Sequence, residues 1–414
     1  MNKPRSPFVA TLRRWSVLCL VLALLAGCKG AAPTPEPVTI RFAHPSFDLA
    51  YYQPLAREFN QKNPYITVEL VPRNWDLVGG LDPRDADVLI TSQFAIDELR
   101  SQKLIISLDP LIESDKGIQM SDFYPGAVQL FKASGETWAL PAGLDPYVMY
   151  YNQDLFDQRG VSYPSPDWTW DDFLNLALAL RDPDADIWGY GVVEPFIDPV
   201  LFIYQHGGRI FDSLQEPTRT TFDDPLTIEA LEWYARLLRE HDVAPTAEKV
   251  RKSFGNIEAA IRWGKVGMWM APLSARGGQL EAAKWPMRWG MVPLPRDARA
   301  ATMATAQGYF ITAQCTNHQA CWQWIAFLSK QPTSGFTPVR KSVANSTEYV
   351  QQAGEEVARI AQAATADAEL VRPTDLERFA QVMAIFSRAV TDVIEGRATA
   401  EEAMLKAQAL SPMK

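Results

Sequence analysis

Cysteine and histidine are scarce in this sequence, which limits the metal sites that it can hold. The 414 residues include only four cysteines and four histidines. Two of the cysteines lie in or directly after an apolar N-terminal segment, so Cys315 and Cys321 remain, with His318 between them. Because a structural zinc site takes four such ligands, this set is too small. We therefore expect no bound metal and no cofactor.

Positive charge is also in the minority. The 40 lysines and arginines stand against 49 aspartates and glutamates, which gives a formal net charge of −9 at pH 7. Proteins that bind nucleic acid neutralise its phosphates with clustered lysine and arginine, and the sequence has no such cluster. We therefore expect no nucleic-acid partner.

Catalytic motifs are missing as well. The sequence has no nucleophile elbow, zinc-protease motif or phosphate-binding loop. Two paired carboxylates, at residues 171–172 and 223–224, resemble the acids of a glycosidase, but both fall at predicted helix starts. Because the helix dipole stabilises negative charge there, capping explains both pairs. We predict that the protein is not an enzyme, and a secreted carbohydrate-active enzyme is the less favoured alternative.

A long apolar run occurs only near the N-terminus. Residues 15–26 follow a basic segment and are too few to span a membrane as a mature helix. The run ends in Leu25-Ala26-Gly27-Cys28, which matches the lipobox of bacterial lipoproteins. We predict a signal peptide over residues 1–27, a lipidated Cys28, and a proline-rich tether over 28–37 that anchors the protein to the outer face of the cell membrane. A plain secretory peptide with an incidental cysteine is the alternative.

The pair Cys315 and Cys321 has two interpretations. In an extracytoplasmic protein, two cysteines this close indicate a small disulfide. Closing so short a loop would contribute roughly 2–3 kcal/mol of stability in the chain-entropy model. Two reduced thiols at the start of a helix are the alternative, because the sequence does not define their geometry.

The first part of the exported chain predicts a parallel sheet. Residues 38–43, 66–71 and 87–91 have the pattern of strands, and a helix with Tyr52, Leu55 and Phe59 on one face lies between the first two. Ligands of such sheets bind beyond the carboxyl ends of the strands. The candidate ligand residues at these ends are Phe47, Trp75, Ser92 and Gln93.

Two proline-containing stretches predict crossings between two lobes. Chain length alone favours two lobes over a single core. Leu140-Pro141 precedes a loop with Asp145 and a strand over residues 147–151, and residues 293–295 (PLP) are a second extended stretch. Helix starts are predicted at Thr169 and Thr399, each followed by an acidic residue three positions later.

These features together resemble a known family. The markers are Cys28 and residues 138–141 (WALP), 150–156 (YYNQDLF), 169–173 (TWDDF), 207–208 (GG), 264–269 (GKVGMW), 293–295 (PLP) and 339–341 (VRK). In their order and spacing they resemble the extracellular solute-binding proteins of ABC importers, in the sugar-binding, maltose-binding-protein-like class. The resemblance implies an α/β fold of two lobes with a hinge and a ligand cleft between them. We predict that residues 38–140 and 296–330 form the N-terminal lobe and residues 141–292 and 331–414 the C-terminal lobe.

The resemblance also suggests which residues contact the solute. Sugars bind through aromatic rings against their apolar faces and planar polar groups at their hydroxyls. The predicted aromatic residues are Trp75, Tyr147, Trp269 and Tyr309, and the predicted polar residues are Gln93, Asp145 and Arg340. Adjacent tyrosines serve as iron ligands in related proteins, but Tyr150 and Tyr151 fall in a predicted strand, where packing is the favoured role.

The function that follows is the capture of a solute for transport. We predict a monomeric, membrane-tethered receptor that binds a mono- or oligosaccharide in the cleft and delivers it to the transmembrane subunits of an ABC permease. The alternative is the same role for a non-sugar solute, such as a polyamine, a peptide or a metal chelate.

Overall fold

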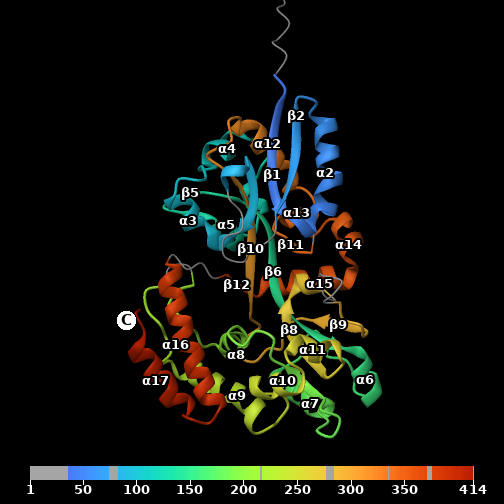
Figure 1. Cartoon of the computed structure of the whole chain (residues 1–414), viewed down its shortest axis with the longest axis vertical. Helices are drawn as coiled ribbons and strands as arrows, with labels where there is room; N and C mark the ends of the chain where they lie inside the picture. The colour runs from blue at the N-terminus through green and yellow to red at the C-terminus, as the bar shows by residue number, and fades with distance from the viewer. Residues whose placement is uncertain are drawn as a thin grey trace, which may run out of the picture.

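A computed structural model describes residues 36–73, 83–214, 217–276, 284–333, 335–370 and 375–413. The predictions for the signal peptide, Cys28 and Trp75 therefore lie outside the described residues. The chain folds into two α/β lobes, one above the other in Figure 1, and a large sheet runs through both. Among the described helices, none is both long and apolar enough to cross a membrane.

The strands of this sheet follow the order β2-β1-β3-β10-β6-β8-β7. Their bounds are Ile66–Arg73 (β2), Val38–Pro45 (β1), Val88–Ser92 (β3), Thr302–Ile311 (β10), Leu140–Asn152 (β6), Val266–Pro272 (β8) and Trp188–Gly191 (β7). As predicted, the first three strands are parallel, whereas β10 runs antiparallel to β3. Three short strands pair at the side of this path: β9 (Trp289–Val292) and β11 (Thr337–Pro338) with β6, and β12 (Ala368–Leu370) with β10.

Strand β6 joins the lobes. Its first part, Leu140 to Pro146, pairs with β10, and its second part, from Tyr147 to Asn152, pairs with β8 and β9. The change of partners between Pro146 and Tyr147 marks the crossing, and Figure 1 shows β6 and β10 running from one lobe toward the other. The boundary predicted at residues 140 and 141 lies within the part of β6 that pairs with β10.

Helices of the first lobe cover its part of the sheet. They are α2 (Leu49–Lys62), α3 (Ile96–Ser101), α4 (Asp109–Ser114), α5 (Pro125–Leu130) and α12 (His318–Leu328). Aromatic rings in edge-to-face contact join β1, α2 and α12. The ring centroid of Trp324 lies 5.6 Å from that of Phe42 and 5.1 Å from that of Phe59. A disulfide joins Cys315 and Cys321, and both are buried beside this core.

The second lobe is richer in helices. They are α6 (Gln153–Arg159), α7 (Trp170–Leu180), α8 (Asp198–His206), α9 (Pro225–Arg239), α10 (Ala247–Ser253), α11 (Ile257–Arg262), α15 (Glu355–Ala366), α16 (Leu376–Ile394) and α17 (Ala400–Leu410). The predicted capping boxes are confirmed at Thr169 with Asp172 and at Thr399 with Glu402. Capping boxes are readable from sequence because they depend on residues only three positions apart.

One predicted helix start is wrong. The pattern predicts a helix over residues 254–263, but α11 begins at Ile257. Gly255 has a left-handed φ of 83°, and the Asn256 side chain accepts a hydrogen bond from the amide of Ala259. The glycine and the cap therefore separate α10 from α11.

Hydrophobic residues of the two lobes form separate cores. One cluster is built around β1, β3, β10 and α12, and two others lie on the two sides of β8 in the second lobe. The residues at which one lobe ends and the other begins remain a prediction. The position of Val339 is relevant to this prediction. This residue packs in the first cluster, although residues 331–414 are predicted to belong to the second lobe.

Candidate functional site

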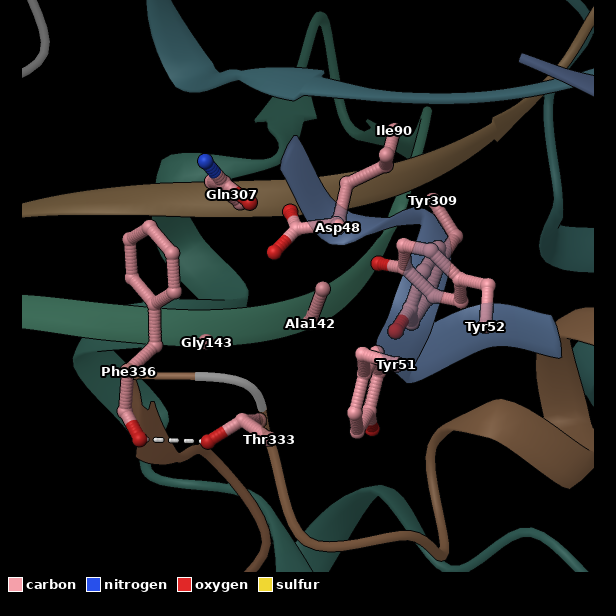
Figure 2. A pocket seen from close by; sticks show the side chains of 10 residues that line it. All are labelled: Asp48, Tyr51, Tyr52, Ile90, Ala142, Gly143, Gln307, Tyr309, Thr333 and Phe336. Atoms are coloured by element: carbon pink, nitrogen blue, oxygen red, sulfur yellow. Dashed lines mark hydrogen bonds between the residues drawn. The ribbon is translucent and has the colours of Figure 1, made fainter. Parts of the chain in front are cut away.

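A narrow pocket of about 20 Å³, enough for a water molecule, lies where the first lobe meets the crossing strands. It is lined by Asp48, Tyr51, Tyr52, Ile90, Ala142, Gly143, Gln307, Tyr309, Thr333 and Phe336 (Figure 2). Asp48 belongs to the short helix η1 (Ser46–Asp48), which directly follows the carboxyl end of β1. This is the edge of the sheet at which the sequence predicts the ligand.

Tyrosines form one side of this pocket. Tyr51 donates to the carbonyl of Pro332 at 2.5 Å, and Tyr52 shares a side-chain hydrogen bond with Tyr309. Burial raises the pKa of all three phenols above the usual value for tyrosine. They therefore stay protonated at neutral pH and can donate as well as accept hydrogen bonds. Tyr309, which the sequence predicts as a solute contact, lines this pocket and is itself buried.

Opposite the tyrosines, Phe336 closes the pocket over β6. A Cβ atom added at Gly143 would come within 2.7 Å of the Cβ of Phe336, so the approach of this ring requires a glycine there. Figure 2 shows the ring of Phe336 standing above Gly143, on the side of the pocket away from the tyrosines.

The predicted residues at the ends of β1 and β3 differ in their accessibility. Phe47 is 51% exposed. Ser92 is half-buried and accepts a hydrogen bond from the amide of Phe94, whereas Gln93 is buried and its side-chain oxygen accepts from the amide of Ala306 at 2.8 Å. Gln93 therefore ties β3 to β10, and its oxygen is already engaged. Phe94, 37% exposed, was not among the predicted residues although it follows the same strand end.

Asp145 lies at the crossing and is buried. One carboxylate oxygen accepts from the amide of Ser274 at 2.9 Å, and the other accepts from the Ser274 hydroxyl at 2.6 Å. Burial raises the pKa of Asp145 to about 6, although the two hydrogen bonds and the nearby Arg276 act in the opposite direction. The sequence predicts an exposed loop residue here that contacts the solute. The structure instead places it within continuous strand β6, which has partners on both sides.

Tyr147, two residues further along β6, is half-buried and faces acidic groups of the second lobe. Its pKa is raised by burial and by the negative charges of Glu194, Asp198 and Asp145. The phenol therefore stays protonated and can donate a hydrogen bond to an oxygen of a solute. Tyr150, by contrast, is fully buried, and its hydroxyl donates to the carbonyls of Pro272 and Leu273.

Trp269 is not accessible, which corrects the stacking role predicted for it. It is fully buried, stacks on Tyr150 at 6.1 Å between ring centroids, and meets the edge of Trp285 at 4.8 Å. The cause is its position in β8, which has neighbours in the sheet on both sides and hydrophobic clusters on both faces. A sugar could stack on this ring only if the core opened.

Arg340 is also engaged within the protein, so it does not offer a free guanidinium to a solute. Its Nε donates to Asp122 at 2.8 Å, and the guanidinium lies 5.3 Å from the centre of the Phe123 ring. Burial raises the pKa of Asp122, but hydrogen bonds from Ser342 and Arg340 outweigh this and lower it. The sequence could not show this pair, because the two partners are more than two hundred residues apart.

Glu194 and Phe196 were missed by the sequence analysis. Strand β8 runs antiparallel to the second part of β6, so its carboxyl end returns to the crossing, and β7 is parallel to β8. Glu194 and Phe196 follow the carboxyl end of β7 and therefore lie on the side that faces the first lobe. Phe196 is 50% exposed, and the pKa of Glu194 is raised by burial and by Glu258. The rule applied to the first lobe would have found both residues.

Residues 45–332 match the family described as bacterial extracellular solute-binding protein. The protein belongs to this family.

Individual relatives of this solute-binding protein are distant in sequence, and the share of each chain that matches differs among them. A binding protein from Brucella abortus is 23% identical over 364 residues, which is 83% of this chain and 85% of that protein. The erythritol/L-threitol-binding protein of Mycolicibacterium smegmatis is 29% identical over 159 residues, or 33% of this chain and 32% of that protein. An ABC substrate-binding protein from Listeria monocytogenes, solved in complex with cycloalternan, has a TM-score of 0.73 at 20% identity and covers 90% of this chain and 98% of its own.

The pocket and the strand ends of this solute-binding protein carry groups that suit non-covalent recognition of a solute. Phenols at the pocket donate and accept hydrogen bonds, and exposed phenylalanines stand at strand ends of both lobes. Within the described ranges, no group of three or more histidine, cysteine, aspartate and glutamate side chains could hold a metal ion.

Proposed function

We propose that this solute-binding protein is the receptor of an ABC importer that captures a carbohydrate between its lobes and delivers it to a permease. The observation that carries the proposal is the placement of exposed aromatic rings at the strand ends of both lobes. Phe47 and Phe94 follow β1 and β3 in the first lobe, and Phe196 follows β7 in the second. Exposed aromatic rings at these strand ends are available to pack against the apolar faces of a sugar ring.

The polar groups at the same edge suit a polyhydroxylated solute. A sugar has apolar ring faces and a rim of hydroxyls that both donate and accept hydrogen bonds. Tyr147 and Tyr309 offer phenols, and the carboxylate of Glu194 is an acceptor for two hydroxyls. The solutes of two relatives, cycloalternan and erythritol or L-threitol, support this class.

A cationic solute such as a polyamine is the second candidate. Asp48 is at the pocket, Asp145 is at the crossing, and Glu194 follows β7, so the described edge carries several acids. An amine would be attracted to such a surface, whereas a neutral sugar would use the acids only as hydrogen-bond acceptors.

The remaining parts of the proposal concern the cell surface. The lipobox at Cys28 and the proline-rich residues that follow support a lipid anchor and an extracytoplasmic tether. Family membership supports permease subunits as the partner. We propose that the protein acts as a monomer and that binding shifts an existing equilibrium between open and closed lobes.

Isothermal titration with a panel of solutes tests this function. The panel comprises erythritol, L-threitol, maltose, maltotetraose and cycloalternan, with spermidine and a tripeptide as non-sugar solutes. We expect saturable binding of at least one carbohydrate at one molecule per protein. Binding of spermidine or the peptide alone would replace the carbohydrate proposal, and hydrolysis of a glycoside by the pure protein would overturn the receptor function.

A further inference from the structure

A hollow on the second lobe lies apart from the edge at which we expect the solute. Its volume is about 450 Å³, which is within the range of sites for small molecules. Its walls come from the start of α7, the end of α8, one side of α9 and the segment after β9. The lining residues are Thr169, Trp170, Asp171, His206, Glu229, Trp233, Arg236, Arg296 and Asp297.

Helix α8 separates this hollow from the solute edge. Glu194 and Phe196 precede the helix, whereas His206, which lines the hollow, is its last residue. A helix of this length spans roughly 12 Å, at 1.5 Å per residue. A ligand in the hollow would therefore leave the edge between the lobes free for the solute.

Stacked aromatic rings line the buried side of the hollow. The ring of Trp170 stacks on that of Trp233 at 4.2 Å and on that of His206 at 5.5 Å between centroids. The indole nitrogen of Trp170 donates to Oε1 of Gln205 at 2.7 Å, which fixes the ring in place. Trp233 is half-buried, so part of its ring is accessible to a ligand.

Two arginines of the hollow have guanidinium groups that no acceptor among the described residues binds. The Nε atom of Arg236 is buried and has no hydrogen-bond partner. Arg296 is exposed, and Asp172, the acid that feels its charge, accepts hydrogen bonds from Thr169 instead. A buried donor without an acceptor costs free energy, which an acceptor on a ligand would recover.

Two acids of the hollow are already engaged by His206. Its Nδ1 lies 2.5 Å from a carboxylate oxygen of Asp297, and its Nε2 lies 3.3 Å from one of Glu229. Burial lowers the pKa of His206, but the hydrogen bonds to these acids outweigh it and raise the pKa, which increases the protonated fraction of the ring. The third acid, Asp171, is exposed to solvent. The arginines therefore keep their charge for a ligand.

We propose that this hollow is a second ligand site, which binds a small organic molecule through an oxyanion group, either a carboxylate or a phosphate. Arg236 and Arg296 bind the oxygens, because a guanidinium can donate two parallel hydrogen bonds to such a group. The organic part of the molecule covers the accessible part of the Trp233 ring. This site does not depend on the class of solute that binds between the lobes.

Three related sugars test the site. They are glucuronate, which carries a carboxylate, glucose-6-phosphate, and neutral glucose with the same added salt. The indole signal of Trp233 in proton–nitrogen correlation spectra, identified by its loss in Trp233→Phe, reports binding at this place. We expect at least one of the two anions to shift the signal saturably and glucose to leave it unchanged. The anion that shifts it identifies carboxylate or phosphate as the group bound.

Substitution of the arginines shows whether they hold the anion. Arg236→Gln and Arg296→Gln should each raise the Kd of the anionic sugar by about tenfold, the effect of losing one charge-assisted hydrogen bond. Neither substitution removes a side-chain hydrogen bond among the described residues, so the melting temperature should stay at the wild-type value. Arg251→Gln, at an exposed arginine of α10, is the matched control and should bind the anion as wild type does.

Several results would overturn the second site. They are a Trp233 signal that neither anion shifts, a signal that glucose shifts as strongly as the anions do, and equal affinity for the anion in wild type and both arginine variants. Phe47→Ala and Phe196→Ala, which change the solute edge, should leave the Trp233 shift intact. If they abolish it, the anion binds between the lobes and the second site is wrong. Failure of every carbohydrate to bind between the lobes would leave this test unaffected.

Discussion

The exposed phenylalanines Phe47 and Phe196 are the single residues that we most expect to contact the carbohydrate. Replacing Phe47 or Phe196 with alanine should weaken carbohydrate binding by roughly 0.5–1.5 kcal/mol for each ring, about two- to tenfold in Kd. Both side chains are about half exposed, so the melting temperature should hardly change. Titration calorimetry measures the affinity. Trp263→Ala is the control, because this tryptophan is 59% exposed at the end of α11. Equal affinity in wild type and the Phe47→Ala and Phe196→Ala variants would contradict the aromatic contacts.

Arg340 tests whether a predicted ligand residue has a structural role instead. Its ion pair with Asp122 is shielded, so Arg340→Met should lower the free energy of unfolding by about 1–3 kcal/mol, as for other hydrogen bonds to charged groups. Urea unfolding measures this loss. Solute affinity of the folded variant should stay at the wild-type value. A stable variant with greatly weakened binding would restore the predicted contact with the solute.

Residue by residue, the sequence predicts which edge of the sheet binds solute but not which side chains are free there. Phe47 is exposed, and Tyr309 lines the pocket. Gln93, Trp269 and Arg340 are engaged by partners that lie far along the chain, which are Ala306, Tyr150 and Asp122. Accessibility depends on such distant contacts, which a single sequence does not show. Glu194 and Phe196 could have been found, because β7 ends in the same pattern of strand and loop as β1.

Among the elements, the disulfide at the start of α12 is expected to stabilise the first lobe. Replacing Cys315 and Cys321 together with serine removes a loop closure that is worth roughly 2–3 kcal/mol. The melting temperature of the double variant should therefore fall, and addition of a reductant should shift wild type in the same direction. If the variant and wild type melt together in both buffers, the bond does not contribute to stability.

Local signals account for the elements that the sequence predicts well. The helices that follow Thr169 and Thr399 begin with the predicted capping boxes, and α9 begins directly after the predicted helix start at residues 223–224. The sequence does not show that β6 continues through Pro141 and Pro146 as one strand. A proline normally interrupts a central strand. Here β6 stays continuous because it pairs with β10 along its first part and with β8 and β9 along its second.

For the whole molecule, Asp145 predicts a pH dependence of stability. Its pKa of about 6 in the folded protein is above the ordinary value of 3.8, so the folded state holds this proton more tightly. The free energy of unfolding should therefore fall as the pH rises from about 4 to about 6, by up to about 3 kcal/mol from this group. The Asp145→Asn variant has no carboxyl group to titrate at this position. The free energy of unfolding of wild type, relative to that of the variant, should therefore decline over this pH range. A difference in urea midpoints that is independent of pH would contradict the raised pKa.

The central claim concerns the whole molecule: two lobes joined by β6 and β10 capture a carbohydrate between their facing edges. The most direct measurement is calorimetric titration of the purified protein with the carbohydrate panel, in parallel with a variant that combines Phe47→Ala and Phe196→Ala. We predict saturable binding of one carbohydrate molecule by wild type and a clear loss of affinity in the folded double variant. Binding of no carbohydrate, or equal binding by both proteins, would contradict the account.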